Sequence, residues 1–135
     1  MKRSLFTAAA IALLALSLVP TFSGSAQGTS APKLENLLRS QLARVSDTEV
    51  IVSRVTLAPG AALPKHWHPG EEFAFILEGS VSVKLDGKDT IIAKAGEAAA
   101  VPYKAIHSAK SGSEGAVILI FRVHELGEPE RVLVK

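Results

Sequence analysis

Between Glu49 and Val123 the chain is a succession of short runs in which every second residue is apolar. Residues 72–77 and 81–85 both follow this pattern, whose two-residue period is typical of a strand rather than a helix. The runs end at glycines and prolines, and Asp86-Gly87 is a hairpin turn signal. The last long run, residues 117–123, is apolar on both faces. Many short strands separated by such turns predict an all-β fold, an antiparallel sandwich or barrel.

The first 26 residues have the three parts of a secretory signal peptide. Two basic residues open the chain, an apolar run covers residues 5–19, and small residues stand at positions 24 and 26, ahead of Gln27. The apolar run is shorter than the roughly 20 residues that span a bilayer. The chain has no cysteine that could carry a lipid. We therefore expect cleavage after residue 26, a periplasmic or secreted product, and no stable membrane anchor after cleavage.

The remaining chain is long enough for one compact domain. We assign residues 27–33, rich in small residues and proline, to a flexible lead-in and residues 34–135 to a single domain. The leucines of residues 34–45 fit a helix and a strand equally well. The full chain has 15 basic and 13 acidic residues, and loss of Lys2 and Arg3 makes these numbers equal. A domain without net positive charge is not expected to bind nucleic acid.

Three of the four histidines and one glutamate stand in two glycine-bounded segments, Gly60-x5-His66-x-His68-x3-Glu72-x6-Gly79 and Gly96-x5-Pro102-x4-His107. Residues two apart in a strand face the same way, so His66 and His68 should point together. Pro69-Gly70 then turns the chain so that Glu72 returns to the same place, whereas Glu71 points to solvent. Three imidazoles and one carboxylate suit one divalent transition metal (Fe, Mn, Ni, Cu or Zn) with open coordination positions.

These segments resemble the two conserved motifs of the cupin family, G-x5-H-x-H-x3,4-E-x6-G and G-x5-P-x-G-x2-H-x3-N. The resemblance covers a core of about residues 50–123. It implies a jelly-roll β-barrel of six to eight antiparallel strands, often a homodimer, with the metal inside one mouth. The ligands that it implies are His66, His68, Glu72 and His107.

Two positions depart from the family pattern: Lys104 replaces a glycine and Ser111 replaces an asparagine. A lysine with positive φ is strained, so we expect the turn before His107 to differ slightly. His124 fits neither motif, and we expect it to face solvent. Ala74 and residues 98–100 are small, which predicts either a pocket above the metal or close sheet packing.

Two functions are compatible with such a site. The first is a metal-dependent enzyme with dioxygenase-, isomerase- or lyase-like chemistry on a small organic molecule. In this reading Glu72 is also the candidate catalytic residue, because the resemblance allows it to accept a proton. The alternative is a non-catalytic module that binds or senses a metal or small ligand.

Overall fold

The computed structural model describes residues 30–135. They form eight strands: β1 (Lys33–Gln41), β2 (Thr48–Leu57), β3 (Ala62–Trp67), β4 (Gly70–Leu85), β5 (Thr90–Lys94), β6 (Ala98–Val101), β7 (His107–Glu125) and β8 (Val132–Leu133). All strand pairs are antiparallel, which confirms the all-β prediction. Residues 34–45, left open between helix and strand, lie largely in β1. No helix within residues 30–135 could cross a membrane. The expected signal peptide and residues 27–29 of the expected lead-in lie outside the described residues.

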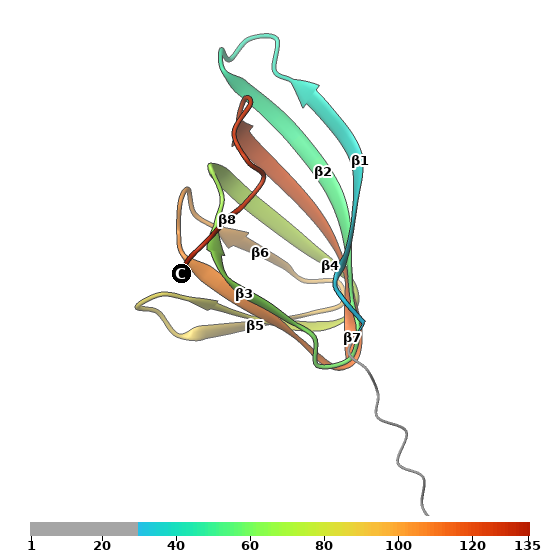
Figure 1. Ribbon diagram of the computed structural model, residues 1–135. Helices are drawn as coiled ribbons and strands as arrows, with labels where there is room; N and C mark the ends of the chain where they lie inside the picture. Colours follow the sequence, from blue (N-terminus) through green and yellow to red (C-terminus); the bar gives the residue numbers. More distant parts are fainter. Residues whose placement is uncertain (1–29) are drawn as a thin grey trace, which may run out of the picture.

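The two longest strands, β4 and β7, bend and pair with each other along both of their halves (Figure 1). The first half of β4 pairs with the second half of β7, and these strands continue into β6 on one side and into β2 and β1 on the other. The second half of β4 pairs with β5 and with the first half of β7, which is followed by β3 and β8. The strands thus form two curved layers of a jelly roll that face each other across the core.

The bend of β4 occurs at Gly79, the last glycine of the first motif. Gly79 has a φ of +69°, and a Cβ atom placed there would lie 2.1 Å from the carbonyl oxygen of Gly115 on β7. Only a glycine avoids both the strain and the collision. The motif glycine therefore allows the two long strands to approach closely where one layer passes into the other.

The inner faces of the two layers form the hydrophobic core. It contains residues from β2, β4, β6 and β7 that alternate with outward-facing neighbours. Its members include Val55, Leu57, Ile76, Val81, Val83, Leu85, Val101, Ile118 and Ile120. In the first half of β4 the inward residues are those in phase with Glu72 and Ile76, and after the register shifts around Gly79 they are Val81, Val83 and Leu85.

The outer face of the first layer remains apolar. Phe73, Phe75 and Leu77 on β4 and Phe121 on β7 are each 40–45% exposed. Phe73 and Phe121 lie opposite each other in the register, with ring centroids 6.5 Å apart. A single copy of the described chain leaves this group of four side chains, which we call the outer apolar face, in contact with solvent.

Candidate metal centre

Three buried imidazoles meet at one end of the space between the layers. His66 lies on β3 and His107 opens β7, and the two residues are paired directly across the strands. His68 follows β3 in the short turn to β4. The three side chains are at most 3% exposed. The two-residue spacing therefore does what the sequence predicted: His66 and His68 are buried together, whereas Lys65 is exposed and Trp67, which stands between the histidines, is half-buried.

The three rings are close enough to share one cation. One nitrogen atom from each of His66, His68 and His107 can be chosen so that all three lie within 4.8 Å of one another. The ring centroids of His66 and His107 are 4.2 Å apart, and that of His68 is 4.8 and 5.3 Å from theirs. The described residues thus contain a three-histidine cluster with the composition of a transition-metal site.

Backbone carbonyl groups determine which nitrogen of each ring faces the cluster. The Nδ1 atoms of His66 and His107 donate to the carbonyl oxygens of Pro64 and Ala105 at 2.7 and 2.9 Å. His68 Nδ1 donates in the same way to the carbonyl oxygen of Glu130. A carbonyl oxygen can only accept, so each Nδ1 carries the proton and each neutral ring keeps an Nε2 lone pair for a metal. This is the arrangement that metal-binding histidines require.

Glu72 stands beside the cluster on the first layer. Its side chain is 8% exposed, whereas Glu71 is exposed, as the parity argument predicted. One carboxylate oxygen of Glu72, Oε2, lies 3.1 Å from His68 Nε2 and accepts a hydrogen bond from Arg122 Nε at 2.8 Å. His68 Nε2 itself makes no well-directed hydrogen bond within residues 30–135. A buried lone pair without a donor, next to a carboxylate, fits a bound cation.

Arg122 is the residue of this site that the sequence analysis missed. Residues 117–123 were interpreted as apolar on both faces, yet Arg122 is in phase with Ile118 and Ile120 and is only 4% exposed. A charged residue in phase with the buried positions of an apolar strand was the available signal. Its partner Glu72 explains the position, since a buried guanidinium requires a carboxylate nearby.

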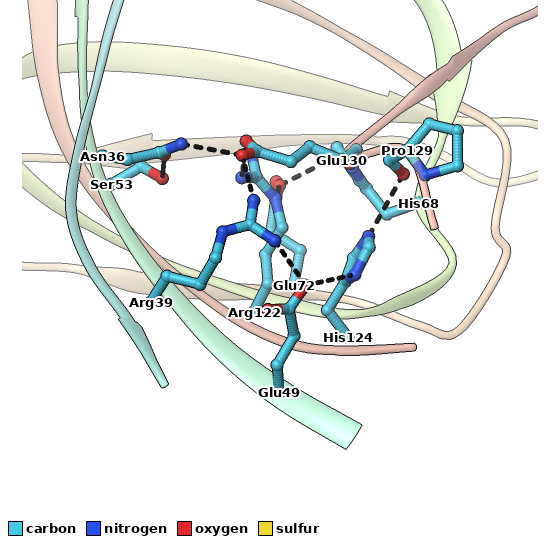
Figure 2. Close-up of polar contacts among 10 residues, drawn as sticks. All are labelled: Asn36, Arg39, Glu49, Ser53, His68, Glu72, Arg122, His124, Pro129 and Glu130. Carbon is cyan, nitrogen blue, oxygen red and sulfur yellow. Dashed lines mark hydrogen bonds and ion pairs between the residues drawn. The ribbon is translucent and has the colours of Figure 1, made fainter. Parts of the chain in front are cut away.

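Arg122 and Glu72 belong to a larger, partly buried network of polar side chains (Figure 2). Arg39 on β1 forms ion pairs with Glu49 on β2 and with Glu130 in the segment before β8. Glu130 also accepts a hydrogen bond from Asn36 at 2.7 Å, and its Oε2 lies 3.7 Å from Arg122 Nη1. Carboxylates and guanidinium groups from five parts of the chain (β1, β2, β4, β7 and the segment before β8) therefore lie beside the centre. The sequence offered no signal for this network, since its pairs are up to 94 positions apart.

Two expectations were wrong. His124, expected to face solvent, is 1% exposed and lies inside β7, where its Nε2 donates to the carbonyl oxygen of Pro129 at 3.2 Å. The same alternation that buries Arg122 buries His124. Lys104, expected to avoid positive φ, has a φ of +55°. Its ammonium lies 3.2 Å from a carboxylate oxygen of Glu125, so a neighbouring ion pair accompanies the strained backbone, and His107 still joins the cluster.

A cavity of about 530 Å³ opens between the layers beside the three histidines. Ala74 and Ala99 line it, whereas Ala98 and Ala100 lie on the exposed side of β6. The small inward residues therefore leave space, and the small outward ones do not contribute to it. A volume of this size is within the range of small-molecule pockets. The cluster forms one polar end of a mostly apolar chamber.

Acid should destabilise the metal-free protein between pH values of about 6.5 and 4. Burial lowers the pKa of His66 to about 4, and it also lowers the pKa of His107. In that range the unfolded chain binds more protons than the folded one, so the free energy of unfolding decreases as the pH falls. The shift at His66 corresponds to at most about 3 kcal/mol.

The pKa of Glu72 adds a second window at lower pH. Burial raises this pKa, but the contacts with His68 and Arg122 outweigh burial and lower it to about 2. The contribution of Glu72 to stability is therefore lost as the pH falls from about 4.5 toward 2.

Urea denaturation at pH values of about 7, 5.5 and 4 measures the loss of stability caused by the histidines. His66→Gln should make the free energy of unfolding less dependent on pH in this range. An unfolding free energy that stays constant across this range would contradict the prediction.

An all-β double layer with buried imidazoles at one end of an internal cavity defines a β-barrel with a histidine-rich centre. The cupin domain family matches residues 53–122, just over half of the chain. The chain therefore belongs to the cupin family, and the resemblance seen in its two motifs is confirmed.

Solved structures agree with this fold. The chain is similar to the DMSP lyase DddQ from Ruegeria pomeroyi DSS-3, with 21% identity and a TM-score of 0.65 over 82% of this chain and 58% of that one. It is also similar to a cupin superfamily protein from Desulfitobacterium hafniense DCB-2, with 19% identity and a TM-score of 0.58 over 73% and 82% of the two chains. Oxalate decarboxylase from Bacillus subtilis has 24% identity and a TM-score of 0.56 over 63% and 24%.

These likenesses establish the fold alone. The chain spans 58% of the length of the Ruegeria lyase and about a quarter of that of the decarboxylase. No curated protein matches the sequence. The function has to be argued from the centre itself.

Proposed function

We propose that this cupin binds one divalent transition metal (Fe, Mn, Ni, Cu or Zn) through His66, His68, His107 and Glu72 and acts on a small organic molecule in the adjoining cavity. The observation that carries the proposal is the shared anchoring of the three rings, each of which donates its Nδ1 proton to a backbone carbonyl. When bound, such a metal supplies Lewis acidity or a site for oxygen.

The chain's own residues supply the rest of the chemistry. The anchored imidazoles fix the direction of three ligands, and Arg122 holds the carboxylate of Glu72 at the edge of the cluster. Glu72 is the group placed to take a proton from a molecule in the cavity, because it is ionised and it lines the chamber. Apolar walls limit the access of water to the same space. These features favour an enzyme over a module that only binds a metal or small ligand.

Similar structures include a lyase, a decarboxylase and an oxidase, so the fold does not select one reaction. The test is elemental analysis of protein purified without oxygen, followed by oxygen-uptake and product screening with small phenols, thiols and keto acids. About one metal ion per chain and turnover that disappears with the metal would support the proposal. Stoichiometric metal without turnover of any probe would favour the binding module, and absence of metal would refute both.

We also propose that the domain works in the periplasm or outside the cell, after removal of residues 1–26. The three-part pattern of those residues supports this location. Mass spectrometry of the exported protein should give an N-terminus at Gln27. Retention of residues 1–26 in the mature protein would refute it.

We propose a homodimer formed through the outer apolar face, Phe73, Phe75, Leu77 and Phe121. Exposed apolar groups of this kind mark interfaces in soluble proteins. Light scattering should give twice the mass of the chain, and Phe73→Ser combined with Phe121→Ser should give a monomer with unchanged metal content. Ile92→Ser is the matched control, because Ile92 is 64% exposed on β5, away from this face. A monomeric wild-type protein would contradict the proposal.

A further inference from the structure

The cavity has two chemically different ends. Small or branched apolar side chains line most of it, among them Val55, Ala74, Val83, Ala99 and Ile118. The other end carries the three histidines, Glu72 and Arg122. A molecule that fills the chamber therefore needs a compact apolar body and one polar group directed at the centre.

Arg122 presents a hydrogen-bond donor that has no acceptor. Its side chain is 5% exposed, its Nε donates to Glu72, and its Nη1 makes no hydrogen bond within residues 30–135. Glu130 Oε2 lies 3.7 Å from Nη1, beyond hydrogen-bond distance. A buried N–H group without an acceptor is costly, and a guanidinium on a cavity wall is suited to a ligand oxygen, above all to that of a carboxylate.

The charges around the centre indicate the sign of that ligand. The buried charges are two carboxylates, Glu49 and Glu72, and one guanidinium group, Arg122. Arg39 and Glu130 form a partly exposed ion pair without net charge, and Arg131 on the cavity lining is exposed to solvent. With neutral histidines the buried group has one negative charge in excess, which a divalent metal converts into one positive charge in excess. A monoanion then brings the buried group to neutrality, whereas a dianion or a cation leaves an uncompensated charge in a desolvated place.

We propose that the ligand of this cavity is a small aliphatic monocarboxylate, whose carboxylate accepts a hydrogen bond from Arg122 Nη1 beside the metal and whose apolar body lies between the two layers. The inference rests on the proposed function, because the charge balance needs the metal. It goes beyond that function by naming the class of ligand and by assigning Arg122 its recognition.

Calorimetric titration of the metal-loaded protein tests the proposal with pairs of probes that differ in charge but hardly in shape. Isobutyrate and isovalerate are compared with isobutyramide and isovaleramide. The acids should bind at least about tenfold more tightly than the amides, since a hydrogen bond to a charged group is the stronger kind. Metal-free protein should bind the acids at least about tenfold more weakly than metal-loaded protein does.

Arg122→Gln should remove the preference for the acids and leave the affinity for the amides nearly unchanged. Arg54→Gln is the matched control, because Arg54 lies exposed on β2 of the same layer and its loss should change neither. The metal content of every variant is measured first. If Arg122→Gln fails to fold, chelator competition on the wild-type protein replaces it: saturating isovalerate should slow metal extraction, and isovaleramide should not.

The outcomes separate the two proposals. Absence of bound metal refutes the proposed function itself. Three results with metal bound would refute the monocarboxylate ligand but not the metal centre. The first is equal affinity for acids and amides, and the second is no binding of the acids. The third is an equal loss of affinity for acids and amides in Arg122→Gln. An effect of isovaleramide on metal extraction equal to that of isovalerate refutes it as well.

Discussion

Replacing His66 or His107 with alanine should reduce the affinity for the metal by more than about 100-fold. Loss of a residue that merely orients a ligand already costs 10–100-fold, and these two side chains are themselves the expected ligands. Their rings lie 4.2 Å apart on paired positions of β3 and β7, so neither can be replaced by a small shift of the other. Elemental analysis of the purified variants, after exposure to a fixed excess of metal, measures the effect.

His124→Ala is the control for this experiment. His124 is as buried as the other three histidines, but it lies outside the cluster and its Nε2 is occupied by the carbonyl group of Pro129. Its replacement should leave the metal content unchanged, provided that the content is normalised to folded protein by circular dichroism. Equal losses of metal in His124→Ala and His66→Ala would overturn the assignment of the ligands.

Arg122→Leu should destabilise the metal-free protein by about 3–5 kcal/mol, the usual cost of removing one member of a buried ion pair. Arg122 and Glu72 are each less than 10% exposed and are joined by a hydrogen bond of 2.8 Å. Without Arg122, the carboxylate of Glu72 remains buried and uncompensated. Urea denaturation at neutral pH measures the loss in free energy of unfolding.

The chain provides both a control and a rescue for this prediction. Arg54→Leu removes an exposed arginine from the same layer and should change stability by no more than about 0.5 kcal/mol. Adding Glu72→Gln to Arg122→Leu should recover part of the loss, because the double variant no longer buries an unpaired charge. A loss below about 1 kcal/mol in Arg122→Leu, or full additivity of the two substitutions, would show that the pair does not act as a unit.

Local patterns in the sequence were sufficient for the strands and for the histidine cluster. The two-residue period indicates which residues of a strand share a face, and the same period turns His66 and His68 toward one place. Gly79 indicates the bend because no residue with a side chain fits at this position beside Gly115. These inferences needed no knowledge of which strands pair.

The second half of the site depends on strand pairing that a local pattern reveals only in part. Arg122 and His124 are in phase with Ile118 and Ile120, but they are buried because the end of β7 lies between β2 and β4, which the two-residue period does not show. Glu130 reaches Arg39 across 91 positions of sequence. The φ of Lys104 is a different case: the turn retained its backbone shape although the glycine that suits it was absent.

The hydrogen bond from His68 to the carbonyl group of Glu130 links the centre to a residue 62 positions later in the chain. Because the main chain of Glu130 orients the ring, while its side chain pairs with Arg39 on the edge strand β1, both extremities of the domain converge on one ligand. Truncations, fusion tags or inserted residues near either extremity should therefore alter the orientation of His68, a proposed ligand. Engineering of this protein should leave those extremities intact and attach its additions to the hairpin between β4 and β5 instead.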